Sequence, residues 1–151
     1  MLAAVLLLGG LAACSPEPLP VLGLAVVEDR PVVVLVPCNG YSEVSVYPRD
    51  GDSTGPNLQW RADASSVTEV TELVLLAEPP PGWQGAAAAG ALRPQVQYNL
   101  SGASGSGART VPFTLEDLQG LPAGRVLTAD RNGAKEMDRA EFESQARKSC
   151  P

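Results

Sequence analysis

Short runs of apolar and β-branched residues, separated by turn-forming residues, constrain the fold of this chain more than any other feature. These runs cover residues 31–38, 42–47, 57–62, 71–77, 95–100, 109–113 and 125–129. Runs of this length and spacing predict about seven short strands. In a domain of this size they favour a mainly β fold, an antiparallel β-sandwich of immunoglobulin-like architecture. The pattern does not determine the order of the strands in the sheets.

The first two runs are separated by a dipeptide that is typical of tight hairpins. Asn39-Gly40 tolerates the positive φ angles that a two-residue hairpin turn requires. We therefore expect residues 31–38 and 42–47 to pair with each other as antiparallel strands.

Two short helices are predicted in the C-terminal third. Thr114 can cap a helix over residues 115–119, which Gly120 would end. Asp138 and Glu141 have the spacing of a capping box before residues 139–150. On this second helix Phe142, Ala146 and Cys150 recur every four residues, so they share one face that can rest on the sandwich.

Small residues and prolines mark the expected loops. The stretches 85–91 and 101–108 contain mainly Gly, Ala and Ser, which bury little surface, so both are predicted to be mobile loops. Trp83 follows the three prolines at 79–81 and is a candidate binding residue; the alternative is that it plugs one end of the sandwich. Trp60 lies within a strand pattern and is expected in the core.

Residues 130–141 partly resemble the calcium-binding loop of the EF-hand family. Oxygen ligands are expected there at the positions of Asp130, Asn132, Asp138 and Glu141. However, Ala134 replaces a further ligand, and Lys135 replaces the glycine of the sharp turn and adds a positive charge beside the ion. A hairpin turn at 130–133 followed by a capped helix explains the same residues. We therefore expect no metal and no other cofactor.

Composition excludes several classes of function. The chain is 44% hydrophobic and 19% charged, as soluble globular domains are. Its net charge of −6 argues against binding to nucleic acid and against a polybasic contact with anionic lipid. It contains no histidine, which removes the usual general base near neutral pH. The only lysines, Lys135 and Lys148, lie in a charged region that is typical of a solvated surface. We expect no catalytic residues and no enzyme activity.

The N-terminus carries the most specific motif. Residues 2–13 form an apolar run of twelve residues, whereas a membrane-spanning helix needs about 20. The run ends in the small residues Ala12 and Ala13, as a secretory signal peptide does. Leu11-Ala12-Ala13-Cys14 resembles the bacterial lipobox. This resemblance implies that the signal at 1–13 is removed and that Cys14 carries a diacylglyceryl lipid, with palmitate-type chains, as its membrane anchor.

Two features leave alternatives open at this end. No Lys or Arg precedes the apolar run, so the natural start can lie upstream of Met1. Residues 2–13 can also be a buried strand or helix with Cys14 as a core thiol. Against this, the segment that follows is rich in proline, which indicates an extended tether. We expect the tether to cover residues 14–30 and the domain to cover 31–151.

The lipobox resemblance also resolves the odd number of cysteines. If Cys14 carries lipid, Cys38 and Cys150 remain as one pair. Outside the cytoplasm such a pair is expected to form a disulfide bond. The alternative is two separate buried thiols.

The whole chain loosely resembles small Ala-, Gly- and Pro-rich lipoproteins of high-GC actinobacteria. This resemblance implies a protein held by its lipid on the outer face of the cytoplasmic membrane, where it acts as a non-catalytic binding or structural module. The expected contact surface includes the loops around Trp83 and residues 101–108, and its partner is an unidentified envelope protein or ligand. The alternatives are an accessory or inhibitor subunit of an envelope complex, or an envelope hydrolase.

Overall fold

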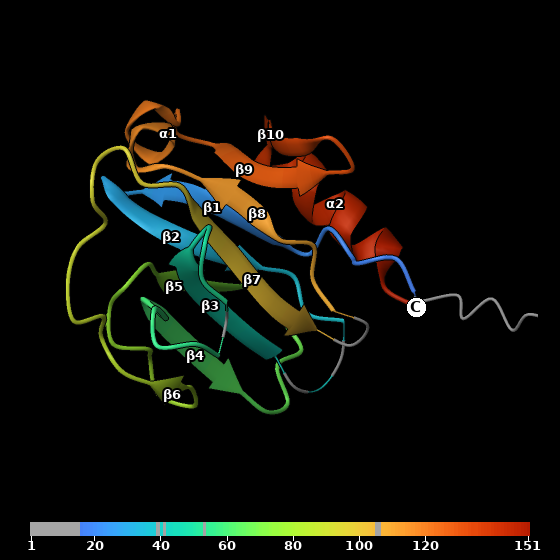
Figure 1. The fold of residues 1–151 in the computed structure, drawn as a ribbon. Helices are drawn as coiled ribbons and strands as arrows, with labels where there is room; N and C mark the ends of the chain where they lie inside the picture. Colours follow the sequence, from blue (N-terminus) through green and yellow to red (C-terminus); the bar gives the residue numbers. More distant parts are fainter. Residues whose placement is uncertain (1–15, 39, 41, 53, 105–106) are drawn as a thin grey trace, which may run out of the picture.

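Two antiparallel five-stranded sheets pack face to face in the computed structural model (Figure 1). The structure describes residues 16–38, 40, 42–52, 54–104 and 107–151. The strand order is β10-β9-β1-β2-β5 in the first sheet and β6-β4-β3-β7-β8 in the second. The elements are β1 (Leu22–Val27), β2 (Arg30–Leu35), β3 (Ser42–Pro48), β4 (Trp60–Ala64), β5 (Thr71–Val74), β6 (Gln84–Gly85), β7 (Tyr98–Ser104), β8 (Val111–Phe113), α1 (Leu115–Gly120), β9 (Arg125–Asp130), β10 (Gly133–Asp138) and α2 (Arg139–Ser149). The predicted β-sandwich is confirmed.

The predicted tether is wrong over much of its length, because residues 14–30 contain the central strand of the first sheet. β1 lies between β2 and β9 and is mostly buried. It joins β2 through a two-residue turn in which Glu28 and Asp29 have φ angles of 49° and 60°. Both central residues of a type I′ turn take positive φ, normally with Asn or Gly. Glu-Asp is not a dipeptide that indicates such a turn, so the sequence pattern did not predict this hairpin.

The predicted hairpin between residues 31–38 and 42–47 is also wrong. β2 pairs with β1 and β5, whereas β3 pairs with β4 and β7, so the two runs lie in different sheets. Gly40 does have a positive φ of 77°, and Asn39 lies outside the described residues. The connection therefore carries the chain across the sandwich, from one sheet to the other. A local turn signal cannot distinguish such a crossing from a hairpin.

Of the two stretches of small residues that were predicted to be loops, one contains part of a strand and the other is largely a loop. Residues 101–104 were expected in a loop but continue β7, which pairs with β3 as far as Ser104. Gly102 is required there because a Cβ at this position would lie 2.2 Å from the backbone oxygen of Glu43. Residues 86–91 contain no helix or strand, as expected. The strand predicted at 71–77 ends at Val74, and β6 and β10 were not predicted.

Both helices begin at the predicted caps. The Thr114 side chain accepts a hydrogen bond from the backbone of Asp117, and Asp138 accepts from Ala140 and Glu141. α2 covers the outer face of the first sheet, where the buried ring of Phe142 lies near Gly23; a Cβ at Gly23 would lie 2.3 Å from Cγ1 of Val126. Trp60 is buried as predicted, and its Nε1 donates to the Ala77 carbonyl at 2.8 Å. None of the helices in the described ranges is long and apolar enough to span a bilayer.

Candidate functional site

The β1–β2 hairpin runs the length of the sandwich and defines its two ends. Its turn, Glu28–Asp29, lies at one end, which we call the distal end. Leu22 and Leu35 pair at the other end, which we call the anchor end because residue 16 lies there. Strands of six residues span about 20 Å, so the two ends are separated by at least that distance. In Figure 1, α1 lies towards the distal end and the C-terminus at the anchor end.

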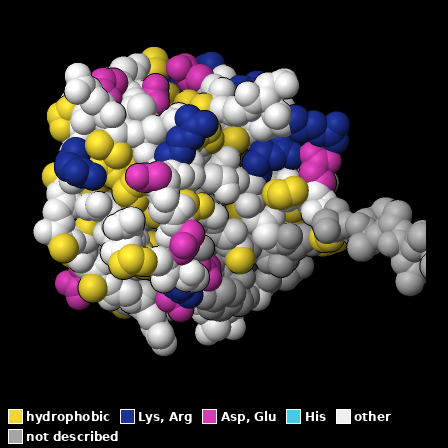
Figure 2. All heavy atoms as spheres, viewed as in Figure 1, with side chains coloured by type: hydrophobic (Ala, Val, Ile, Leu, Met, Phe, Trp, Pro, Cys, Tyr) yellow, Lys and Arg dark blue, Asp and Glu magenta, His cyan; other side chains and the backbone are white. Residues whose placement is uncertain are grey.

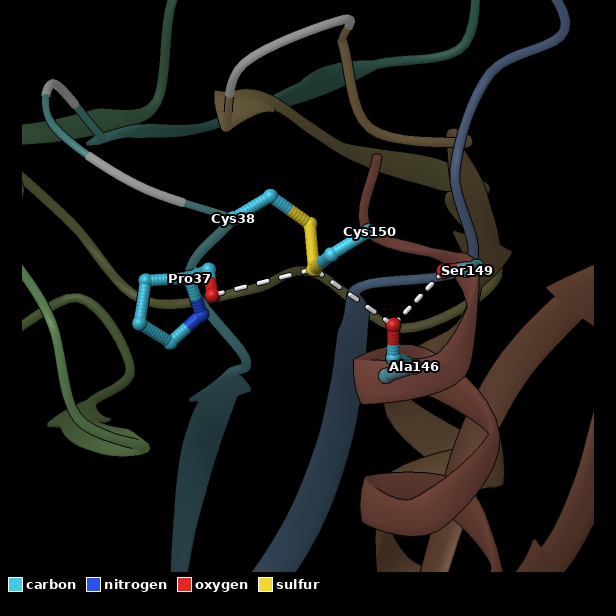
Figure 3. The surroundings of a disulfide bond; sticks show 5 residues. All are labelled: Pro37, Cys38, Ala146, Ser149 and Cys150. Atoms are coloured by element: carbon cyan, nitrogen blue, oxygen red, sulfur yellow. Dashed lines mark hydrogen bonds between the residues drawn. A yellow bond between two sulfur atoms is a disulfide. The ribbon is translucent and has the colours of Figure 1, made fainter.

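The cysteine pair closes the anchor end. Cys38 and Cys150 form a disulfide bond with a Cα–Cα distance of 5.2 Å, as the sequence predicted (Figure 3). The Cys150 sulfur lies 3.8 Å from the Pro37 carbonyl oxygen and 3.6 Å from that of Ala146. The bond thus joins the segment after β2 to the end of α2. Phe142 and Ala146, the other two members of the predicted helix face, are buried against the sandwich.

The segment before β1 is fastened to the same end. Glu17 accepts hydrogen bonds from Arg109 at 2.6 Å and from Arg131 at 2.7 and 2.9 Å. Leu19 forms a parallel bridge with Ala108, through bonds from Leu19 N to the Gly107 oxygen and from Arg109 N to the Leu19 oxygen. The chain is therefore held to the domain from Glu17 onward. Cys14, the predicted lipid site, lies outside the described residues.

The ion pair of Glu17 is expected to make this fastening sensitive to acid. The hydrogen bond from Arg131, followed by the charges of Arg131 and Arg109, holds the pKa of Glu17 below its ordinary value of 4.5. A carboxylate with a lowered pKa stabilises the folded arrangement above that ordinary value, and the contribution is lost as the pH falls through the lowered pKa. We expect Glu17→Gln to speed hydrogen exchange at the Leu19 amide at neutral pH. The gap between parent and variant should close as the pH falls below the ordinary value of 4.5 and through the lowered pKa of Glu17.

Hydrogen exchange measured by NMR across this pH range tests the expectation, with Glu136→Gln as the matched control. Glu136 pairs with Arg125 on the surface, away from Leu19, so its variant should exchange like the parent at that amide. Equal exchange in the parent and in Glu17→Gln at neutral pH would show that the ion pair does not hold the segment.

Trp83, the predicted binding residue, is half-buried. It packs against the core and lines a hollow of about 270 Å³ between residues 64–71 and Pro81. Residues 101–104 lie on β7, which β4 and β3 separate from β6 and Trp83. Neighbouring strands are about 4.8 Å apart, so more than 10 Å separates the two parts of the predicted contact surface. Both lie towards the anchor end, but the structure does not join them into one site.

A larger apolar groove, of about 600 Å³, lies at the distal end where the sandwich opens between its sheets. It is open to solvent on one side, and five segments line it. The lining residues are Val26, Asp29 and Pro31 of the β1–β2 hairpin, Leu75 and Leu76 after β5, Ala91 and Leu92 of the next loop, Leu115, Leu118 and Gln119 of α1, and Leu121 and Ala123 beyond it. We call this the distal groove. Its size and mainly apolar lining are typical of ligand sites.

Hydrogen bonds hold the loop that forms one wall of the groove. The Ala88 amide donates to the Leu76 oxygen at 2.8 Å, and Gln59 Nε2 donates to the Gly90 oxygen at 2.9 Å. The Arg93 amide donates to the buried Tyr98 hydroxyl at 2.9 Å. These bonds fix the wall within the domain itself, so binding need not supply the energy to order it.

Leu76 occupies an unusual backbone conformation at the groove. Its φ is 64°, in a turn closed by a bond from the Ala77 amide to the Val74 oxygen at 3.2 Å. The third position of such a turn normally takes Gly or Asn, because a leucine there is strained. The turn ends β5 early and directs this apolar residue into the groove lining. Strained residues cluster at binding and active sites.

Polar groups are few in the lining of the groove, which contains one carboxylate, Asp29, and one amide, Gln119. The EF-like segment lies apart from the groove and forms the β9–β10 hairpin and the start of α2. In the hairpin turn, Asp130 accepts from the Asn132 amide at 2.7 Å, while Asp138 caps α2 from the far end of β10. The hairpin interpretation is confirmed. Across the described ranges, no three Asp, Glu or Cys side chains gather as metal ligands would.

The distal groove cannot be predicted from the sequence because its lining comes from five separate segments. One local signal was available: Leu115 and Leu118 are three residues apart and lie on the same face of α1. A second signal was the run of apolar residues at 73–76. Side chains alternate between the two faces of a strand, so one face cannot bury all of them. No family model, curated protein sequence or solved structure matches this chain.

Proposed function

We propose that this protein is a lipid-anchored, non-catalytic binding domain on the outer face of the cytoplasmic membrane. In this proposal Cys14 carries the lipid, and the distal groove receives an apolar segment of an envelope polypeptide. The observation that carries the proposal is the preformed apolar groove at the end of the sandwich farthest from residue 16. That end points away from a membrane attached at Cys14, towards possible partners.

The chemistry of the groove favours binding over catalysis. Burial of apolar surface stabilises a complex by roughly 25 cal/mol per Å², which suits a lining made mainly of Leu, Val, Ala and Pro. Asp29 is an isolated carboxylate in that lining, and the chain has no histidine to serve as its acid–base partner. An acid–base mechanism normally needs two groups of different pKa.

Charge at the mouth of the groove indicates which segment fits. Asp29 and Glu28 form the tip of the β1–β2 turn, and both are exposed; the adjacent Arg30 pairs with Glu28 at 3.7 Å. Glu116 and Asp117 are exposed in the first turn of α1, whose next residues line the groove. Opposite charges across an interface guide association and select partners. The expected partner segment therefore has apolar side chains flanked by Lys or Arg.

Selection from a displayed peptide library on the purified protein tests this proposal. We expect the enriched peptides to combine apolar residues with at least one Lys or Arg. Ala91→Arg places a cation in the groove and should weaken their binding about ten-fold or more, because this cation faces the Lys or Arg of the peptide and is desolvated without a partner. Isothermal calorimetry with an enriched peptide gives the affinities.

The matched control for this experiment lies in the same loop. Ala89→Arg changes another exposed alanine two residues away that does not line the groove, and it should bind the peptide like the parent. Peptides that bind Ala91→Arg and the parent equally would place the binding surface elsewhere. A selection that enriches nothing would count against a peptide-binding groove.

A further inference from the structure

We propose that a basic surface at the anchor end contacts anionic lipid headgroups and holds the domain with its distal groove facing away from the membrane. The surface consists of the exposed side chains of Arg131, Lys135 and Lys148 with the mostly buried Arg109 beside them, and it is called the basic surface below. This inference rests on the proposed lipid at Cys14, because that anchor brings the basic surface to the bilayer.

The fastened N-terminal segment sets the distance between the domain and its anchor. Glu17 is the third residue after Cys14 and is bound by Arg109 and Arg131. Three extended residues reach about 10 Å, so Glu17 lies within that distance of the lipidated residue. A free tether of seventeen residues would let the domain turn in any direction. This short link keeps the anchor end beside the headgroups, within about one Debye length at physiological salt.

Four cations gather at this end although the chain as a whole is acidic. Lys135 and Arg109 line one hollow with Pro20, Asp130 and Gln145. Lys148 follows Gln145 by three residues, so it lies on the same face of α2, one turn closer to the end of the helix. Arg131 is exposed at the hairpin turn, its side chain 79% accessible. Figure 2 shows Lys and Arg side chains flanking a carboxylate at the end where the C-terminus lies.

The two lysines carry the positive charge of this surface that no described carboxylate pairs with. Glu17, Asp130 and Glu141 are acidic groups beside the basic surface; Glu17 is shared between two arginines, and Glu141 accepts a hydrogen bond from Gln145. Neither lysine forms a salt bridge with any described residue. With a net charge of −6 for the whole chain, carboxylates outnumber cations over the rest of the domain. An anionic bilayer therefore attracts the anchor end and repels the distal end, which orients the domain.

The two lysines of the chain report directly on this contact. The lipidated protein is placed in vesicles of phosphatidylcholine, alone or mixed with phosphatidylglycerol, and is treated with a small uncharged acylating reagent. Mass spectrometry then gives the reaction rate at each lysine. We expect labelling of both to slow about five-fold on the anionic vesicles, the factor that corresponds to about 1 kcal/mol for a cation near such a surface. High salt should restore the rate.

Charge reversal separates a specific contact from a general effect of the bilayer. In Lys148→Glu the slowing at Lys135 should largely disappear. Arg93→Glu makes the same charge change near the distal end, where Arg93 is exposed beside Gln95, and it should leave the slowing unchanged.

Three results would overturn the inference. Equal labelling on both kinds of vesicle would show that the basic surface does not contact anionic lipid. Equal slowing in Lys148→Glu and the parent would show that the slowing comes from the bilayer and not from this surface. If the N-terminal peptide carries no lipid, the proposed anchor is wrong and this inference is wrong with it. If the peptide is lipidated but either labelling result above is found, only the contact of the basic surface is refuted.

Discussion

Replacement of both disulfide cysteines, Cys38→Ser with Cys150→Ser, is expected to lower the free energy of unfolding by about 4 kcal/mol. The bond joins residues 112 apart, so it closes a loop that contains almost the whole described chain. In the chain-entropy model a loop of about 100 residues stabilises the folded state by about 4.7 kcal/mol, and measured values tend to be lower. The double replacement leaves neither cysteine of the pair as a lone thiol.

Urea unfolding with and without a reducing agent measures this effect. Reduction of the parent should shift its unfolding midpoint towards that of the double variant, whereas the reductant should not affect the double variant. A loss below about 1 kcal/mol would mean that the core and the burial of Phe142 hold α2 without the bond.

Cys14→Ala is expected to move the protein from the membrane fraction to the soluble, extracytoplasmic fraction or to abolish its processing. The reason is that acyl chains contribute about 0.8 kcal/mol for each buried CH₂, and two chains together give a stable anchor. The apolar run at 2–13 cannot replace the anchor by spanning, because about 20 residues are needed.

Fractionation of cells that express each variant tests this expectation, with the Cys38→Ser, Cys150→Ser protein as the control for cysteine loss in general. That control should remain with the membrane. A Cys14→Ala protein that is processed and remains as firmly membrane-bound as the parent would show that another part of the chain holds it there.

Most strands could be predicted from the sequence because their signal is local. Trp60 and the runs at 98–100 and 125–129 show strand patterns, and the helix caps at Thr114 and Asp138 depend on a few adjacent residues. The spacing of four residues between Phe142, Ala146 and Cys150 also predicted which face of α2 packs on the sandwich. That face brings Cys150 to Cys38. In each case neighbours in sequence determine the structure.

The errors arose where the outcome depends on distant residues. Asn39-Gly40 suggested a hairpin, but β2 already pairs with β1 and β5, so the chain passes to the other sheet. β1 was hidden because prolines precede it and because its turn uses Glu28 and Asp29 in a conformation normally left to Asn and Gly. Likewise Gly102 resembled a loop residue, whereas it allows two strands to approach closely.

The candidate site was the least predictable part for the same reason. Trp83 is conspicuous in the sequence as an aromatic residue after three prolines, but it packs partly against the core. The distal groove exists only once five segments meet, and its strained residue, Leu76, appeared in the sequence as one more apolar position in a strand. Contacts between segments, and not residue types, create this surface.

The measurement that tests the central claim most directly is the mass of the N-terminal peptide of the protein purified from bacterial membranes. The proposed lipid-anchored domain predicts a chain that begins at Cys14 and carries the added mass of a diacylglyceryl group with its fatty acids. A chain that retains residues 1–13 with an unmodified Cys14 thiol, or one cut elsewhere without added lipid, would contradict the account.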